Sequence, residues 1–225
     1  MQVLGHRGVM AEGFTENTWE AFGAAADLGV DGIETDARLT ADGQLVLFHD
    51  RLCATGEPVA EVTRAALEKA EGHAVPELGE TLDRWPHLLW NLELKAPDLA
   101  APLMAVLAAR DAPNVVLSSF FHNLIHDHPE LHAYPIGLII PHRPVSVAAF
   151  LGEWTARPLD WCVWNRDFVD ETILTAARDA GITNVLYNLH TQADLHQAES
   201  WPVSGVIMDQ PELALERGHG GSSRS

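Results

Sequence analysis

Short apolar runs alternate with amphipathic stretches along most of the chain. The runs have the length of buried strands, and the stretches between them have the spacing of helices that pack one face on a core. The predicted strands are Val3–Gly5, Gly32–Ala37, Leu45–Phe48, Leu88–Leu94, Val115–Ser118, Ile136–Ile140, Trp161–Trp164, Asn184–Tyr187 and Gly205–Met208. The predicted helices are Thr18–Leu28, Leu78–Trp85, Leu99–Arg110, Val145–Leu151, Asp170–Ala180, Ala193–Glu199 and Pro211–Glu216. This alternation is typical of βαβ units and therefore of a parallel sheet.

About eight such units favour a closed barrel over an open, doubly wound sheet. An open sheet normally carries a glycine-rich phosphate loop after its first strand, and Gly5-His6-Arg7-Gly8 lacks that spacing. We therefore predict an α/β protein with a (β/α)8 TIM-type barrel, formed as one domain by residues 1–217. Residues 50–76 interrupt the alternation, which predicts a short loop excursion after the second strand. The Gly/Ser-rich residues 218–225 are predicted to be a disordered tail.

Acidic side chains occupy alternate positions of two predicted strands. Residues two apart in a strand share a face, so Glu34 and Asp36 are predicted to point the same way. Two adjacent carboxylates repel unless they are paired, share a proton or bind a cation, and a hard divalent cation is the economical solution. Glu93 repeats the pattern with Lys95, which predicts a third metal ligand and a lysine free to meet a phosphate oxygen. The alternatives are solvated acids at a strand end and a structural Glu–Lys pair.

Two histidines and one arginine stand at predicted strand ends, where barrels carry their catalytic side chains. His6 and His49 each close a short apolar run. Histidine titrates near neutrality, so the two can supply one base and one acid. Arg7 follows His6 and suits bidentate phosphate contacts. A second group runs through a predicted loop containing Pro129, and we interpret it as non-functional; its members are His122, His126, His128 and His132.

The segment after the first strand contains a predicted helix start. Asn17 followed three residues later by Glu20 is typical of an N-cap. A catalytic role for Glu16 or Asn17 is favoured equally.

The charge of the chain limits its partners. The 225 residues carry a formal charge of −18, which argues against binding to nucleic acid and to anionic membranes. A phosphate group must then be met by a metal ion or by a few placed Arg and Lys residues. The two cysteines form no disulfide framework, and neither a secretory signal nor a membrane span is evident. We expect a cytoplasmic monomer or homodimer acting on a small-molecule phosphodiester, with no stable membrane association.

The motifs together resemble the glycerophosphodiester phosphodiesterase family. The pattern of that family is similar to His-Arg-Gly, Glu-Asn-Thr, an acid–x–acid strand, Thr-x-Asp-Gly and His-Asp. The chain has, in the same order, His6-Arg7-Gly8, Glu16-Asn17-Thr18, Glu34-Thr35-Asp36, Thr40-Ala41-Asp42-Gly43 and His49-Asp50. It continues with Val75-Pro76-Glu77-Leu78, Glu93-Leu94-Lys95, Ser118-Ser119-Phe120 and Gly205-Val206-Ile207-Met208-Asp209.

The resemblance implies a barrel enzyme that hydrolyses glycerophosphodiesters to glycerol 3-phosphate and an alcohol. It implies one divalent metal ion, Mg, Ca or Mn, with the ligands Glu34, Asp36 and Glu93. It also implies an acid–base pair, His6 and His49, and two phosphate contacts, Arg7 and Lys95.

Two segments depart from the pattern of the family. Tyr187-Asn188-Leu189-His190 stands where members commonly carry Trp-Thr-Val-Asn, and Cys53-Ala54-Thr55-Gly56 replaces the usual Arg-Thr-Thr. Both would border the alcohol or glycerol moiety, so they bear on substrate identity. The alternative functions are a phosphodiesterase for lysophospholipids or other diesters, and a non-catalytic module that binds glycerol phosphates. Binding alone needs no acid–base couple, so the histidine pair argues against the module.

Overall fold

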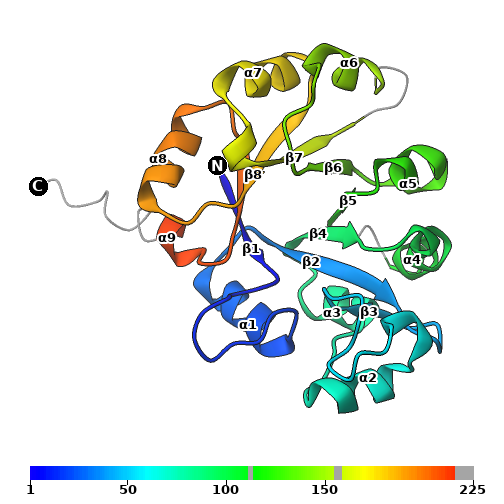
Figure 1. The fold of residues 1–225 in the computed structure, drawn as a ribbon. Coiled ribbons are helices and arrows are strands. Elements are labelled where there is room, and N and C mark those ends of the chain that lie inside the picture. Colours follow the sequence, from blue (N-terminus) through cyan, green and yellow to red (C-terminus); the bar gives the residue numbers. More distant parts are fainter. Residues whose placement is uncertain (111–113, 155–158, 216–225) are drawn as a thin grey trace, which may run out of the picture.

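Eight parallel strands of the described part of the chain close into a barrel (Figure 1). This computed structural model describes residues 1–110, 114–154 and 159–215. The barrel order is β1-β2-β4-β5-β6-β7-β8-β9, and β9 pairs back with β1. The strands are β1 (Gln2–His6), β2 (Gly32–Leu39), β4 (Leu89–Leu94), β5 (Val115–Ser119), β6 (Ile136–Ile140), β7 (Trp161–Asn165), β8 (Thr183–Tyr187) and β9 (Gly205–Met208). The predicted barrel is therefore confirmed.

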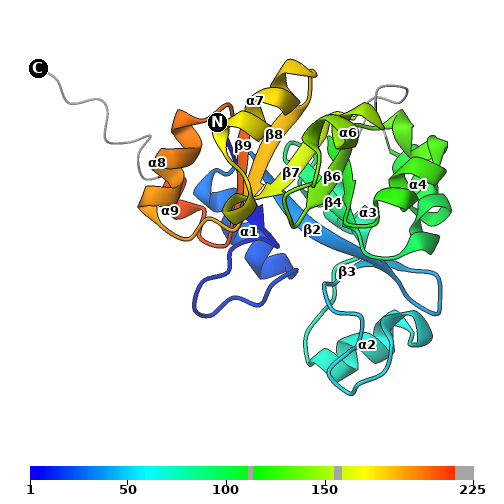
Figure 2. The same ribbon diagram turned by 45° about the horizontal axis from the view of Figure 1, so that its top comes forward.

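Helices surround the barrel in both views (Figures 1 and 2). The α-helices are α1 (Trp19–Leu28), α2 (Arg64–Glu71), α3 (Leu78–Arg84), α4 (Ala100–Ala108), α5 (His122–Asp127), α6 (Val147–Gly152), α7 (Glu171–Asp179), α8 (Gln192–Ser200) and α9 (Glu212–Leu215). Short 3₁₀ turns are η1 (Val59–Glu61), η2 (Pro97–Leu99), η3 (Pro129–Ala133) and η4 (Arg166–Phe168). None of the helices in the described ranges is long and apolar enough to cross a membrane. The predicted tail, 218–225, lies outside the described residues.

The alternation of side chains along the strands builds two separate cores. Outward positions such as Ile33 and Leu92 pack with the helices in one large apolar cluster. Inward positions form a second cluster inside the barrel, made of Leu4, Leu89, Val116, Ile139, Trp161, Val163, Val185 and Ile207. The interior of the barrel is therefore a packed core.

The predicted strand Leu45–Phe48 exists but does not belong to the barrel. It forms β3 (Leu45–Leu47), which pairs antiparallel with β2. The turn from Thr40 to Gln44 is far too short for the crossover that a parallel neighbour needs, so only a hairpin can form. Gly43, at a φ of 76°, supplies the left-handed residue of this turn.

The excursion over residues 50–76 contains more structure than the predicted loop. It includes η1 and α2, which begins at the N-cap Thr63 and ends at the left-handed Gly72. A small apolar cluster of its own holds it together: Val46, Cys53, Val59, Val62, Leu67 and Val75. Figure 2 shows α2 beside β3, to one side of the barrel ring. Likewise, part of the segment from His122 to His132 that was predicted as a loop forms α5.

Candidate active site

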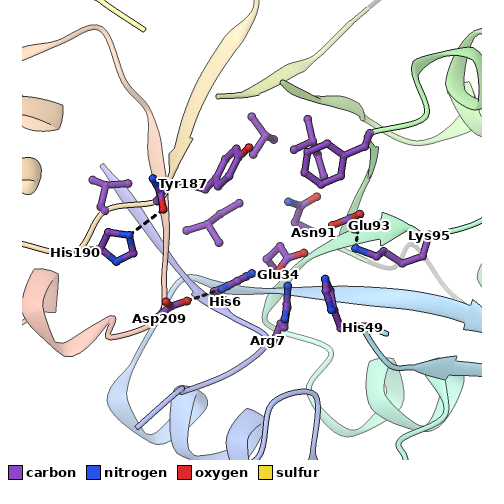
Figure 3. A pocket seen from close by; sticks show the side chains of 16 residues that line it. His6, Arg7, Glu34, His49, Asn91, Glu93, Lys95, Tyr187, His190 and Asp209 are labelled. Atoms are coloured by element: carbon purple, nitrogen blue, oxygen red, sulfur yellow. Dashed lines mark hydrogen bonds and ion pairs between the residues drawn. The ribbon is translucent and has the colours of Figure 1, made fainter. Parts of the chain in front are cut away.

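A cavity of about 280 Å³ opens where the barrel strands end at their carboxyl termini (Figure 3). One side of it is charged and the other largely apolar. Its lining residues are His6, Arg7, Glu34, His49, Asn91, Glu93, Lys95, Phe120, Ile139, Val163, Tyr187, Asn188, Leu189, His190, Ile207 and Asp209. The cavity therefore gathers six of the seven predicted site residues, and the seventh, Asp36, lies buried beside it.

The three predicted metal ligands converge. Glu34 and Asp36 lie on β2, and Glu93 lies on β4 as the register partner of Asp36. One carboxylate oxygen from each lies within 4.8 Å of the other two, the spacing at which one ion can be shared. All three are buried, and neither Glu34 Oε2 nor Asp36 Oδ1 has a hydrogen-bond partner. Hard oxygen donors with unsatisfied lone pairs fit a divalent cation such as Mg²⁺ or Ca²⁺.

Two cations partly neutralise this acidic cluster. Lys95 Nζ lies 2.8 Å from Glu93 Oε1 and 3.3 Å from Asp36 Oδ1. Arg7 Nε lies 3.1 Å from Asp36 Oδ2. Both predicted phosphate contacts are thus already paired with carboxylates.

The surroundings drive the pKa values of the carboxyl groups apart. Burial and the charge of Asp36 raise the pKa of Glu34 to about 8. Burial also raises the pKa of Glu93, although Lys95 opposes the shift. For Asp36, burial is outweighed by Arg7 and Lys95, which hold its pKa below the usual value. The raised pKa of Glu34 means that the site holds too little positive charge to keep all three carboxyl groups ionised. A bound cation would supply that charge.

The first predicted catalytic histidine is held by an aspartate from the far end of the chain. His6 Nδ1 lies 2.5 Å from Asp209 Oδ1, and its Nε2 lies 3.7 Å from Glu34 Oε2 (Figure 3). Burial lowers the pKa of His6, but the hydrogen bond to Asp209 and the charge of Glu34 raise it above its ordinary value. Asp209 fixes the ring and its tautomer, so Nε2 is the nitrogen directed toward the acidic cluster. Asp209 is therefore a functional candidate that was not predicted from the sequence.

The second histidine is half-buried, like the first. His49 Nδ1 lies 2.8 Å from Asp50 Oδ1, and the His49 carbonyl accepts bonds of 2.9 and 2.7 Å from the Arg38 guanidinium. These contacts hold the backbone and one ring nitrogen. His49 lines the cavity beside Arg7 (Figure 3).

The segment after β1 is held in unusual backbone conformations. Arg7 and Asn17 have φ values of 55° and 53°, in the left-handed region that side chains disfavour. Asn17 Nδ2 donates to Asp36 Oδ2 at 2.8 Å, and Asn17 Oδ1 accepts from Thr35 at 2.6 Å. The N-cap interpretation of Asn17 is wrong, because Thr18 caps α1. Asn17 instead orients a carboxylate of the acidic cluster, and such strain is typical of functional sites.

Gly8 should be indispensable to this segment. It has a φ of 96°, and a Cβ there would lie 2.6 Å from the Ala21 backbone. We expect Gly8→Ala to lower the free energy of unfolding in urea by about 2–5 kcal/mol, from strain plus overpacking. Gly13→Ala is the matched control, because Gly13 has a similar φ of 94° with nothing within 4 Å of its Cβ. Equal losses in the two variants would contradict the close-packing argument.

The far wall of the cavity carries side chains to which the sequence analysis gave no catalytic role. Tyr187 is the last residue of β8, and Asn188 and His190 follow it. His190 Nε2 lies 2.8 Å from Asn188 Oδ1. Asn188 is the third non-glycine residue with a positive φ, at 69°. By contrast, His122 and His132 contact backbone carbonyls, and the four histidines of that segment line no part of the cavity.

Known proteins of one family match this chain. A family model described as "Glycerophosphoryl diester phosphodiesterase family" matches residues 6–213. The chain is 33% identical over 127 residues to Probable glycerophosphodiester phosphodiesterase 2 of Mycobacterium tuberculosis, covering 52% of this chain but only 47% of that protein. It is 26% identical over 242 residues to the glycerophosphodiester phosphodiesterase of Caldanaerobacter subterraneus subsp. tengcongensis, covering 95% of this chain and 96% of that protein.

Solved structures share the fold. The glycerophosphodiester phosphodiesterase of Thermotoga maritima superposes with a TM-score of 0.85 at 24% identity, over 96% of this chain and 97% of that chain. A phosphodiesterase of Oleispira antarctica, solved in complex with the product sn-glycerol-3-phosphate, gives a TM-score of 0.81 at 19% identity, over 96% of both chains. With the family model spanning nearly all of the barrel, this chain belongs to the glycerophosphoryl diester phosphodiesterase family, whose members are phosphodiester-hydrolysing enzymes.

Proposed function

We propose that this protein hydrolyses glycerophosphodiesters to glycerol 3-phosphate and an alcohol, with one divalent metal ion bound by Glu34, Asp36 and Glu93. The observation that carries the proposal is the convergence of these three buried carboxylates, two with an oxygen that accepts no hydrogen bond, beside a cavity that also holds both histidines. Family membership supports the reaction class. The product held by the Oleispira antarctica enzyme supports glycerol 3-phosphate as the product here.

The phosphodiester is bound by the positive side chains of the cavity. When bound, a divalent cation neutralises charge on the phosphoryl oxygens and orients the nucleophile. Arg7 and Lys95 lie against the carboxylates of the cluster, 3.1 and 2.8 Å away. Both are therefore held within reach of a phosphoryl oxygen next to that cluster. Arg7 offers a planar fork and Lys95 a point charge, so together they orient the phosphate and stabilise its transition state.

The two histidines move the protons. One takes a proton from the nucleophile, which is water or the 2-hydroxyl of the glycerol moiety, and the other protonates the leaving alkoxide. Each has its Nδ1 engaged by an aspartate, His6 by Asp209 and His49 by Asp50. The Nε2 atoms are thereby left for the substrate. This shared arrangement suits two side chains that must each present one nitrogen in a fixed tautomer.

The substrate class is tested by comparing a water-soluble glycerophosphodiester with a lysophospholipid. We expect glycerophosphocholine or a similar diester with a small alcohol to be cleaved with a kcat/KM at least about tenfold above that of lysophosphatidylcholine. The net charge of −18 disfavours contact with anionic lipid, and Trp90, Trp154, Trp161 and Trp164 are buried packing residues. The measurement is product analysis with both substrates and a chromogenic bis-ester, with and without chelator. Release of no product from any glycerophosphodiester would refute the proposed function.

One observation favours the lysophospholipid alternative. Exposed apolar side chains follow the carboxyl ends of several strands: Phe14, Leu52, Phe120, Phe121, Val145 and Phe168. They lie on the loops at the mouth of the barrel, where a lipid chain would approach. A clear preference for lysophosphatidylcholine, or sedimentation of the protein with zwitterionic liposomes, would establish this alternative over the first.

The location proposed for the protein is the cytoplasm. Both cysteines are free and buried, as in a reducing compartment.

A further inference from the structure

Asn91 is a buried amide that the proposed mechanism leaves unused. Its side chain is 0% exposed and lines the cavity, yet neither Oδ1 nor Nδ2 has a hydrogen-bond partner among the described residues. Asn184, the other buried asparagine outside the first loop, has all of its side-chain hydrogen bonds made within the protein. It accepts from Trp164 Nε1 at 2.9 Å and donates to two backbone carbonyls at 2.7 and 2.9 Å. Buried amides are normally satisfied, so Asn91 calls for a partner that is not part of the protein.

The position of Asn91 places that partner next to the acidic cluster and deeper in the barrel. Asn91 is the register partner of Glu34 and precedes Glu93 by two residues on the inward face of β4. Figure 3 shows its amide beside these two carboxylates, facing the cavity. Glu34 Oε2, on the adjacent strand, and Ser118 Oγ, on β5, are also buried without a hydrogen bond among the described residues. The remaining floor is apolar, with Ile139, Val163 and Ile207.

The chemistry of this pocket suits a hydroxyl group. An amide offers a donor and an acceptor side by side, and a hydroxyl both donates and accepts. The charge of an anionic phosphoryl oxygen is instead met by Arg7 and Lys95, which lie against the acidic cluster. The apolar floor fits a short carbon chain. A polyol attached to the phosphate satisfies all three features at once.

We propose that Asn91 binds a hydroxyl of the glycerol moiety and so selects glycerol phosphates over phosphates of simple alkyl alcohols. The proposal rests on the proposed function and extends it to the residue that recognises the polyol. A site built to hydrogen-bond a hydroxyl rejects an analogue that lacks it, because the buried amide then stays unpaired.

Binding of two product-like ligands to the metal-loaded enzyme tests this role without depending on turnover. The probes are sn-glycerol 3-phosphate and n-propyl phosphate, which differ only in the two free hydroxyls. We expect the wild type to prefer glycerol 3-phosphate. Asn91→Ala should weaken glycerol 3-phosphate binding by about three- to tenfold and leave n-propyl phosphate within about twofold, as measured by titration calorimetry. The preference should shrink correspondingly.

Stability measurements separate recognition from a structural role. Removing an unpaired buried amide forfeits no hydrogen bond, so Asn91→Ala and the larger Asn91→Leu should unfold at or above the wild-type temperature. Asn184→Ala, which breaks three bonds, should lower the melting temperature yet keep the preference for glycerol 3-phosphate. Equal weakening of both ligands by Asn91→Ala, or no weakening of either, would overturn the proposal. A wild type that cleaves no glycerophosphodiester and does not discriminate the two ligands would instead refute the proposed function, and the hydroxyl assignment with it.

Discussion

Exhaustive dialysis against EDTA is expected to abolish phosphodiesterase activity, and Mg²⁺, Mn²⁺ or Ca²⁺ is expected to restore it. The reason lies in the charge balance of the cavity. Arg7 is already paired with Glu16 and Asp36, and Lys95 with Glu93 and Asp36. The diester anion therefore meets a net excess of carboxylates. Without a cation the loss should exceed about a thousandfold, because both substrate binding and transition-state stabilisation fail together.

Metal binding can also be measured without an activity assay, from the melting temperature of the protein. Added metal should raise the melting temperature of the wild type, since an ion that binds only the folded state stabilises it. Glu34→Gln should lose most of this shift, because it removes one charged ligand and leaves the fold of β2 intact. The matched control is Glu57→Gln, in the excursion and outside the cavity. Full activity in protein shown by elemental analysis to contain no metal would contradict the prediction.

Strand periodicity was sufficient to predict the acidic cluster. Glu34, Asp36 and Glu93 occupy alternate positions of strands whose other faces are mostly apolar, and period two then dictates a shared face. Their convergence follows from the barrel, since the carboxyl ends of all the parallel strands meet at one edge. Both inferences need only local pattern and fold class. The structure brings the three side chains together as this reasoning requires.

The residues that sequence reasoning missed depend on contacts between distant segments. Asp209 acquires its role because β9 pairs with β1, which brings it to His6 across 203 positions of the chain. The residues around Asp209 in the sequence do not predict its contact with His6. The sequence pattern around Asn17 is misleading. An Asn before a helix is typical of an N-cap, yet the left-handed backbone of Asn17 turns its amide onto Asp36. Asn91 follows the same parity as Glu93, and only the three-dimensional structure shows that its amide is unpaired.

The excursion shows the limit of hydrophobic periodicity. Leu67 is the one fully buried residue of α2, so this short helix has almost no apolar stripe to detect. The local signals were present in the sequence, with Thr63 as N-cap and Gly72 after the last turn. Without a repeating apolar pattern between them, these two capping signals were not sufficient to predict a helix. Tertiary packing in the small cluster around Leu67 decides the structure here.

His6→Ala and His49→Ala should each lower kcat by about a hundredfold or more under saturating metal, while the circular dichroism spectrum stays native. Each variant removes an imidazole proposed to exchange a proton with the substrate, and neither histidine belongs to an apolar core cluster. His128→Ala is the control, because that histidine lines no part of the cavity and its side chain pairs with Glu130. Near-normal rates in both His6→Ala and His49→Ala would exclude the acid–base pair.

The leaving group can then assign the two roles. A nitrophenolate departs without a proton, so a glycerol phosphodiester of p-nitrophenol needs no general acid. The variant lacking the acid should therefore recover most of its rate on this substrate, whereas the variant lacking the base should stay slow on every diester. The double variant should be little slower than the worse single variant on glycerophosphocholine, because both histidines serve one transition state and their losses are not additive. If neither variant recovers with the nitrophenyl ester, then neither histidine is the proton donor, and His6 held by Asp209 would have to act only through the orientation of the acidic cluster.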